Sequence, residues 1–184
     1  MRMRLLLVVL VALAPVGCRT RGKLQLPKSP EEAYREVAGA IKKGNLVRVF
    51  ELVDRDSQYA VMSIFEAQGR IAELVRSGYP AERQARELER VQLARQSPDV
   101  NVFFVGYVKQ TGALAALTGL PEGARAEGSG ERVTMRAGNR AVPFCKQGDG
   151  WVYCGWREQL EEQKLRAIRD LTSVREAVET FRGK

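Results

Sequence analysis

Few side chains in this 184-residue chain could carry out catalysis in a familiar way. The chain contains no histidine, which is the commonest general acid or base and the commonest metal ligand in proteins. Its absence excludes Ser-His-Asp and Cys-His catalysis and the usual zinc sites. No G-x-S-x-G motif, P-loop or metal-spaced cluster occurs either. The sequence therefore predicts a protein that is not an enzyme, with no catalytic residue, no metal and no cofactor.

The carboxylates that come nearest to a catalytic arrangement are Asp54 and Asp56. A hydrolase or an isomerase could use such a pair. The segment that holds them, Asp54-Arg55-Asp56-Ser57, is also a typical helix start, because aspartate side chains cap free backbone N–H groups. We therefore expect these carboxylates to cap a helix rather than to act on a substrate.

Two of the three cysteines, Cys145 and Cys154, lie on either side of Asp149-Gly150, which is a two-residue hairpin signal of type I′. Counting outward from this turn places the two cysteines opposite each other at a non-hydrogen-bonded pair. The Cα atoms of such a pair lie about 4.5 Å apart, within the range of a disulfide. A catalytic redox pair would instead carry C-x-x-C at a helix N-terminus. We predict a disulfide between Cys145 and Cys154.

Residues 1–17 have the features of an export signal. Met1–Arg4 is basic, and Leu5–Ala14 is an unbroken apolar run of ten residues, too short to cross about 30 Å of hydrocarbon as a helix. Two cleavage sites compete. Ala12-Leu13-Ala14 is an ordinary small-x-small site that would leave Pro15 first. Val16-Gly17-Cys18 resembles a lipobox, the motif at which bacterial lipoproteins receive a diacylglycerol, although Pro15 stands where leucine is usual.

The odd number of cysteines favours the second cleavage site. A lipid on Cys18 leaves two cysteines that can pair, whereas cleavage after Ala14 leaves Cys18 as a free thiol in an oxidising compartment. We predict a signal peptide over 1–17, a lipidated cysteine and tether over 18–28, and one domain over 29–184. Arg19 follows the cysteine, and by resemblance to known sorting patterns, in which aspartate at this place retains a lipoprotein on the inner membrane, it favours the periplasmic face of the outer membrane.

The charge balance indicates which partners the protein could bind. The formal net charge is +8, and removal of Arg2 and Arg4 with the signal leaves about +6. This excess favours an anionic surface, such as phospholipid headgroups or an anionic envelope polymer. Basic and acidic residues are mixed along the chain, and no run of five or more Lys or Arg occurs. We therefore expect no binding to nucleic acid.

Caps and apolar periodicity predict helices in the first half of the chain and at its end. Ser29-Pro30-Glu31-Glu32 is a capping box, and Lys43-Gly44 ends the first helix. Further helices are expected over 46–53, 57–77, 81–96 and about 157–181. The last should dock on the domain through Leu160, Leu165, Ile168, Leu171, Val174, Val178 and Phe181, leaving Arg166, Arg169 and Arg175 in solvent; an undocked helix would predict oligomers.

The composition changes after Ser97-Pro98-Asp99. The β-branched and aromatic segment 100–108 predicts a strand, 112–118 a short helix or turn, and 120–130 a mobile loop. Strands at 132–137 and 140–147 are joined by Gly138-Asn139, and a third strand follows Asp149-Gly150. Pro143 should cause a bulge or a break in the middle strand. The expected core face of this meander consists of Val133, Met135, Val142, Phe144, Trp151 and Tyr153.

Two stretches resemble the NTF2-like (cystatin-like α+β) superfamily. Ser29 to Val53 is similar to the opening helix, glycine break and short second helix of small secreted members. Val142 to Trp156 (VPFCKQGDGWVYCGW) is similar to their closing hairpin. The resemblance implies an α+β fold in which N-terminal helices pack on a curved antiparallel sheet around a conical pocket, here with an extra C-terminal helix. Exported lipoprotein members look like binding or scaffold modules.

Two functions are therefore expected, and the first of them depends on the membrane anchor on Cys18. The first is a non-catalytic binding or scaffold module for a protein or a polyanionic partner in the cell envelope. The alternative is a carrier or sensor of a small apolar ligand. Six aromatic residues could line the pocket of such a carrier or could simply form the core: Tyr59, Phe65, Phe103, Tyr107, Trp151 and Tyr153.

Overall fold

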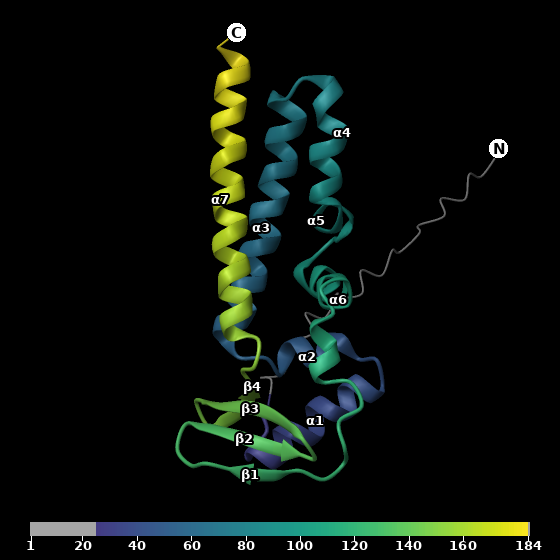
Figure 1. The fold of residues 1–184 in the computed structure, drawn as a ribbon, viewed down its shortest axis with the longest axis vertical. Coiled ribbons are helices and arrows are strands. Elements are labelled where there is room, and N and C mark those ends of the chain that lie inside the picture. Colours follow the sequence, from purple (N-terminus) through teal and green to yellow (C-terminus); the bar gives the residue numbers. More distant parts are fainter. Residues whose placement is uncertain (1–24, 184) are drawn as a thin grey trace, which may run out of the picture.

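The computed structural model describes residues 25–183, which fold into two parts that lie end to end (Figure 1). One part, the sheet end, contains a four-stranded antiparallel sheet. The other part, the stalk, consists of the helices α3 (Arg55–Gly78), α4 (Ala81–Arg90) and α7 (Arg157–Arg182). This range holds seven α-helices and four strands, so the predicted α+β class is confirmed. The predicted signal peptide and Cys18 lie outside the described residues.

At the sheet end, α1 (Pro30–Lys42) and α2 (Leu46–Glu51) begin as predicted. The Ser29 hydroxyl accepts a hydrogen bond from the backbone N–H of Glu32 at 3.1 Å, and the Glu32 carboxylate accepts one from the N–H of Lys28 at 2.7 Å. The buried face of α1 contacts all four strands of the sheet. This helix therefore forms one layer of the sheet end and the sheet forms the other.

The strands are β1 (Arg125–Glu127), β2 (Arg132–Ala137), β3 (Arg140–Gln147) and β4 (Gly150–Tyr153), in the order β1-β2-β3-β4. The hairpin turn at Gly138-Asn139 is confirmed, because Ala137 pairs with Arg140. β1 lies within the segment predicted as a loop. Its three residues are all exposed, so the sequence there has no apolar alternation that could indicate a strand.

The predicted turn between β3 and β4 is wrong. Gln147 pairs with Gly150, so the turn residues are Gly148 and Asp149. Gly148 has φ +60°, and a glycine in the first turn position suits a type II′ hairpin. Cys145 consequently pairs with Val152 rather than with Cys154.

Packing at Gly150 explains why the chain uses the other turn. A Cβ atom on Gly150 would lie 2.3 Å from the Cβ of Leu26, and the next residue, Trp151, donates its N–H to the carbonyl of Pro27 at 2.8 Å. The displacement from the predicted register is two residues, which leaves every side chain on its predicted face. Five residues of the expected core face are buried, and Trp151 is half-buried.

The expected break at Pro143 does not occur, since the β2–β3 register runs unbroken from Arg132↔Cys145 to Ala137↔Arg140. The N–H of Lys146 donates to the carbonyl of Glu131 at 2.7 Å. Hydrogen-bonded pairs alternate along an antiparallel ladder, so the nitrogen of Pro143 points away from β2. The nitrogen of Pro143 instead faces the side of β4. Because β4 ends there, no N–H group of residue 143 is needed for the β3–β4 pairing.

The segment 100–108 is a helix and not a strand, which corrects the prediction. It forms most of α6 (Val100–Gln110), and Asp99 caps it by accepting hydrogen bonds from the N–H groups of Asn101 and Val102 at 2.8 and 3.0 Å. Apolar residues occur around most of this helix, which hides the helical period, and tertiary packing outweighs the small β preference of its residues. Its buried residues are Phe103, Phe104, Tyr107 and Val108.

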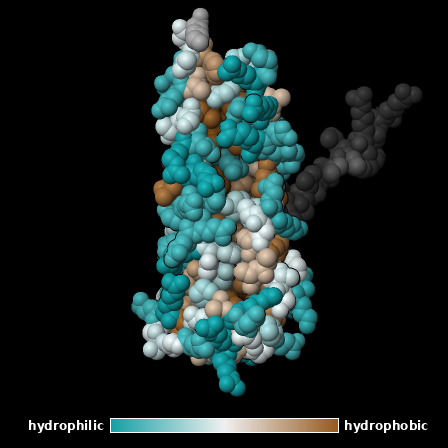
Figure 2. Space-filling view, viewed as in Figure 1, coloured by the Kyte–Doolittle hydropathy of each residue, from teal (hydrophilic) through white to brown (hydrophobic). Residues whose placement is uncertain are grey.

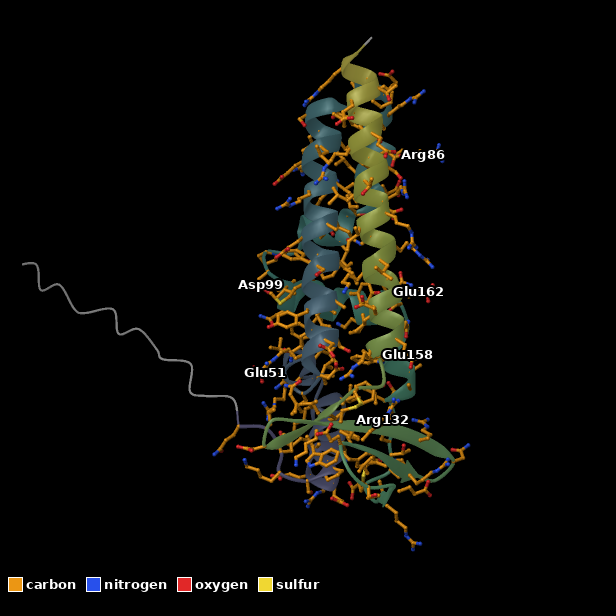
Figure 3. All side chains as sticks on the ribbon, turned by 90° about the vertical axis from the view of Figure 1, so that its left-hand side faces the viewer. Glu51, Arg86, Asp99, Arg132, Glu158 and Glu162 are labelled. Carbon is orange, nitrogen blue, oxygen red and sulfur yellow. A yellow bond between two sulfur atoms is a disulfide. The ribbon has the colours of Figure 1, made fainter. Side chains whose placement is uncertain are left out.

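The stalk is built on a parallel pair of long helices, α3 and α7, which lie side by side along their length (Figures 1 and 3). Near the far end, the rings of Tyr79 and Phe181 have centroids 5.0 Å apart. Each helix repeats small or apolar residues at alternating intervals of three and four, as parallel coiled coils do. The repeating positions are 60, 64, 67, 71, 74 and 78 in α3 and 160, 167, 171, 174 and 178 in α7, while Lys164 stands at the one position of the repeat that is neither small nor apolar.

The last helix therefore docks, as expected, but through a face that differs in part. Leu160, Val174 and Val178 are buried. Leu165 and Ile168, predicted to be buried, are 47% and 45% exposed. Only a narrow strip of α7 faces α3, as in a two-helix coiled coil, and Ala167 lies on that strip in their place. The residues predicted to face solvent, Arg166, Arg169 and Arg175, are all exposed.

We predict opposite effects for two glycine-to-alanine substitutions in α3. A Cβ on Gly78 would lie 2.4 Å from Cγ1 of Val178, whereas a Cβ on Gly69 meets nothing within 4 Å. Gly78→Ala should lower the free energy of unfolding by about 1–3 kcal/mol through overpacking. Gly69→Ala should raise it by about 0.5–1 kcal/mol through helix propensity. Urea unfolding of both variants measures this, and equal effects would contradict the parallel packing.

Candidate functional site

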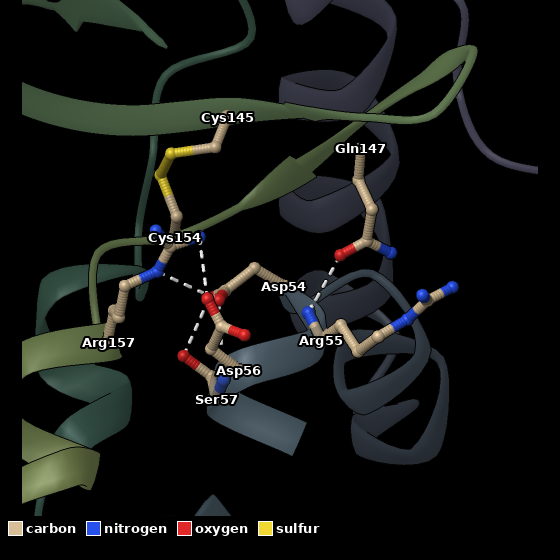
Figure 4. The surroundings of a disulfide bond; sticks show 8 residues. All are labelled: Asp54, Arg55, Asp56, Ser57, Cys145, Gln147, Cys154 and Arg157. Atoms are coloured by element: carbon tan, nitrogen blue, oxygen red, sulfur yellow. Dashed lines mark hydrogen bonds and ion pairs between the residues drawn. A yellow bond between two sulfur atoms is a disulfide. The ribbon is translucent and has the colours of Figure 1, made fainter. Parts of the chain in front are cut away.

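The two carboxylates considered for catalysis lie where the sheet meets the stalk (Figure 4). Asp54 is 1% exposed. Its Oδ1 accepts hydrogen bonds from the N–H of Ser57 at 3.3 Å and from Nε of Arg157 at 3.0 Å, and its Oδ2 accepts one from the Ser57 hydroxyl at 2.6 Å. Asp54 is thus the cap of α3, as expected. Asp56 lies in the first turn, 67% exposed, with Oδ2 3.5 Å from Nη2 of Arg157.

Backbone hydrogen bonds bring the sheet to the same point. The N–H of Asp54 donates to the carbonyl of Tyr153 at 2.9 Å, and the N–H of Tyr153 donates to the carbonyl of Leu52 at 2.8 Å. The segment before α3 therefore pairs in parallel with the end of β4. We call Asp54, Ser57, Tyr153 and Arg157 the junction, because they join α3, β4 and α7.

The predicted disulfide is confirmed and lies beside the junction (Figure 4). Cys145 and Cys154 are bonded, with Cα atoms 5.8 Å apart. The bond joins diagonal neighbours on β3 and the end of β4, since Cys145 pairs with Val152 in the ladder. It fixes the residue three positions before Arg157, where α7 starts.

The side chains of Asp54, Ser57 and Arg157 in the junction bond to one another. Both oxygens of the Asp54 carboxylate are engaged by Ser57 and Arg157, and its carboxylate is closed to solvent. Burial, with a further contribution from Asp54, raises the pKa of the Tyr153 phenol far above its usual value, so that this group stays protonated. No group of three or more Cys, Asp or Glu that could hold a metal occurs within residues 25–183.

Five of the six aromatic residues proposed for a pocket take part in the core. Phe65, Phe103 and Tyr107 pack together, with ring centroids 5.2 and 5.7 Å apart. Tyr153 lies in a second group, with its ring 5.0 Å from that of Trp156. Trp151 packs at the edge of the core.

The sixth residue, Tyr59, is 57% exposed on α3. The structure thus brings three of the six together and separates the rest. Two buried polar atoms in the described core, Oη of Tyr107 and Nε1 of Trp156, have no hydrogen-bond partner. The packing around them is aromatic and tight, which is why we assign these side chains to the core.

Sequence reasoning missed a large groove at the sheet end. It lies between α1 and the segment 117–122, has a volume of about 870 Å³, and we call it the α1 groove. Tyr34 and Leu117 line it and are each only 1% exposed. The Tyr34 hydroxyl donates to the carbonyl of Pro121 at 2.6 Å, and Arg140 donates to the carbonyl of Thr118. These two bonds hold the segment in place above α1.

A weak signal for this groove was present in the sequence. Ala38 and Ile41 lie beside the core face of α1 and make its apolar surface wider than the sheet requires. Leu117 and Leu120 are apolar residues in a segment rich in glycine and proline. Neither feature indicates that the two surfaces meet, since 75 or more residues separate them.

A smaller hollow of about 280 Å³ lies in the stalk between α3, α4 and α7. Figure 2 shows that the outer sides of these helices are largely hydrophilic and that hydrophobic residues appear mainly between them. The hollow mixes apolar residues such as Ile71 and Val174 with the ion pair Glu87–Arg90, whose atoms are 2.9 Å apart. Its walls favour no one kind of ligand.

No helix among the described residues is long and apolar enough to cross a membrane. Comparison with models of protein families, with curated proteins and with solved structures found no match to this chain.

We predict that Asp54→Ala lowers the free energy of unfolding by about 2–4 kcal/mol. The substitution removes a helix cap and leaves the buried hydroxyl of Ser57 without its partner. Asp56→Ala is the matched control and should change stability by less than about 0.5 kcal/mol, because Asp56 is exposed. Urea unfolding of the oxidised protein measures both. A loss at Asp56 as large as that at Asp54 would refute the assignment of the junction.

We also predict that replacing both Cys145 and Cys154 by serine lowers the free energy of unfolding by about 2–3 kcal/mol, because the closed loop is short. A reducing agent should lower the stability of the wild-type protein by a similar amount and should not affect the double variant. Equal stability of the oxidised wild type and the variant would show that the bond does not form in solution.

Proposed function

We propose that this chain is a bacterial envelope lipoprotein, held by a lipid on Cys18, whose described part is a non-catalytic binding or scaffold module. The observation that carries the proposal is the position of the first described residues. Pro27 lies against β4 through its hydrogen bond with Trp151. Only seven peptide steps separate Cys18 from Gln25, the first described residue, and they span at most about 25 Å. A lipid on Cys18 would hold the sheet end close to the membrane.

The stalk supports a scaffold role for the end away from the anchor. Both long helices rise from the sheet end, and their far ends lie at the other end of the molecule (Figure 1). At 1.5 Å per residue, the 26 residues of α7 extend about 39 Å. The protein would thus present a charged surface at that distance from the membrane, where an envelope protein or an anionic polymer could bind. We place it at the periplasmic face of the outer membrane.

The non-catalytic part of the proposal rests on the junction. Its carboxylate, hydroxyl and guanidinium groups bond to one another, and the carboxylate is closed to solvent. We retain the NTF2-like resemblance as a hypothesis for the sheet end, where α1, α2 and the β2–β4 meander follow the expected order. The stalk has no counterpart in that pattern.

The alternative function, carriage of a small apolar ligand, is favoured by a different observation from the one expected. The six aromatic residues do not form a pocket wall in common, but the α1 groove has apolar walls and a volume of about 870 Å³. Sites for small molecules have volumes of about 300–1,000 Å³. The two functions are compatible, since the groove and the stalk lie in different parts of the molecule.

The lipid anchor can be tested by mass. The full chain would be expressed with its own signal in a bacterial host, beside a Cys18→Ser variant, and the intact mass of the protein in the membrane fraction measured. We expect the mass of residues 18–184 plus an acylated glyceryl group, less two protons for the disulfide, and loss of this species in the variant. A soluble, unmodified product that begins at Pro15 would overturn the proposal.

A further inference from the structure

We propose that the α1 groove binds a single-chain anionic amphiphile, of which a free long-chain carboxylate is the simplest example. The proposal rests on the alternative function above, for which it names the ligand class, and it is independent of the lipid on Cys18 and of the envelope partner. The site requires apolar walls for the chain and a cation for the head group. The helix α1 supplies the cation and one of the two walls.

The apolar walls of the groove come from α1 and from the segment 117–122. Ala38 and Ile41 form one wall, and Leu117 and Leu120 form the other. The ring of Tyr34 is buried with Leu117 at 1% exposure. Because the Tyr34 hydroxyl already bonds to the carbonyl of Pro121, it is not free to attract a polar ligand. An alkyl chain is the group that such walls stabilise, through removal of apolar surface from water.

Two basic side chains also line the groove, next to its apolar walls. Arg35 and Lys42 both line the groove from α1, and residues seven apart lie on the same side of a helix, about 10 Å from each other. Glu122 is the one acidic residue in the lining, and its carboxylate lies 3.5 Å from Nζ of Lys42. The pair is strongly exposed and therefore weak. Among residues 25–183, Arg35 has no carboxylate partner, and its Nε donates to the backbone carbonyl of Glu31 at 3.4 Å, so Arg35 is the better site for an anionic head.

Size and shape select one free chain rather than a bilayer lipid. The volume of about 870 Å³ is that of a site for one small molecule. The groove is bounded on both sides, by α1 and by a segment held at Pro121 and Thr118. A molecule with one chain can lie along it. A lipid in the bilayer would have to leave its second chain exposed.

Photo-crosslinking tests the proposal on the full chain. The protein is expressed with its own signal, and whichever fraction holds it is illuminated with a photoreactive long-chain carboxylate. Labelled peptides are then located by mass spectrometry. We expect label on the peptides that contain 34–42 and 117–122. Unlabelled carboxylate of the same chain length should compete for it, and the corresponding alcohol should compete about fivefold less well.

Variants separate the groove from non-specific labelling. Ala38→Trp fills the groove and should reduce the label on both peptides to the level seen without light. Val47→Trp, at an exposed apolar residue of α2 outside the groove, should leave it unchanged. Arg35→Glu should weaken competition by the carboxylate about fivefold. Lys43→Glu, at the C-cap of the same helix but outside the lining, is its matched control. Circular dichroism of each variant checks that it is folded.

Three outcomes would overturn the proposal. The first is label on these peptides that survives Ala38→Trp in a folded variant, and the second is equal competition by carboxylate and alcohol. The third is labelling by a photoreactive diacyl phospholipid alone, which would mean contact with the bilayer. None of them bears on the mass of the Cys18 product, so failure of this site and failure of the lipoprotein proposal are distinguishable.

Discussion

The buried carboxylate of Asp54 is the interaction on which the rest of this structure depends. Two long helices start next to each other and run in parallel, so their partly positive N-terminal ends lie together. Each end also has backbone N–H groups without helical partners. Asp54 caps α3 directly and reaches α7 through Arg157, while the N-cap of α7, Trp156, offers no side-chain hydrogen bond of its own. One acidic group thus serves both helix starts.

Burying a charge costs several kcal/mol unless it is paired and hydrogen-bonded. Ser57, Arg157 and the N-terminal end of α3 supply these partners. The neighbouring disulfide and the backbone bonds to Tyr153 fix the end of β4 at the same point. The sheet end and the stalk are therefore held together by polar groups and by a covalent bond, in addition to apolar packing. The α1 groove lies apart from this junction, beside the core face of α1, where Tyr34 and Leu117 belong both to its lining and to the core.

Much of the fold could be predicted from local signals, and the errors arose where distant residues decide. The caps at Ser29 and Asp54 could be predicted from the sequence because capping is local. The sequence Gly148-Asp149-Gly150 allows two turns, and the choice between them is made by Leu26 and Pro27, more than 120 residues earlier. The disulfide was predicted correctly although the register was not, because both registers bring the two cysteines near each other.

The other errors have the same origin. The helix α6 carries residues that favour strands, and it is helical because aromatic side chains on other elements pack against it, as Phe50 does with Phe104 at 4.6 Å. Burial of Ala167 in place of Ile168 follows from the narrow seam with α3, which the sequence of α7 alone does not show. The candidate site depends most on distant contacts. The α1 groove is formed with a segment that hydrogen bonds from Tyr34 and Arg140 hold over α1, and both bonds join residues far apart in the sequence.

The helices α3 and α7 start in parallel at one junction, and a distance between their far ends tests this arrangement most directly. Spin labels on cysteines introduced at Ser77 and Thr180, both exposed, would be measured by pulsed electron resonance in a Cys18→Ser background with the native disulfide intact. We expect a single narrow distribution below about 25 Å, since the parallel helices end together. A distance near one helix length, about 36 Å or more, or a broad distribution from an undocked α7, would contradict the account.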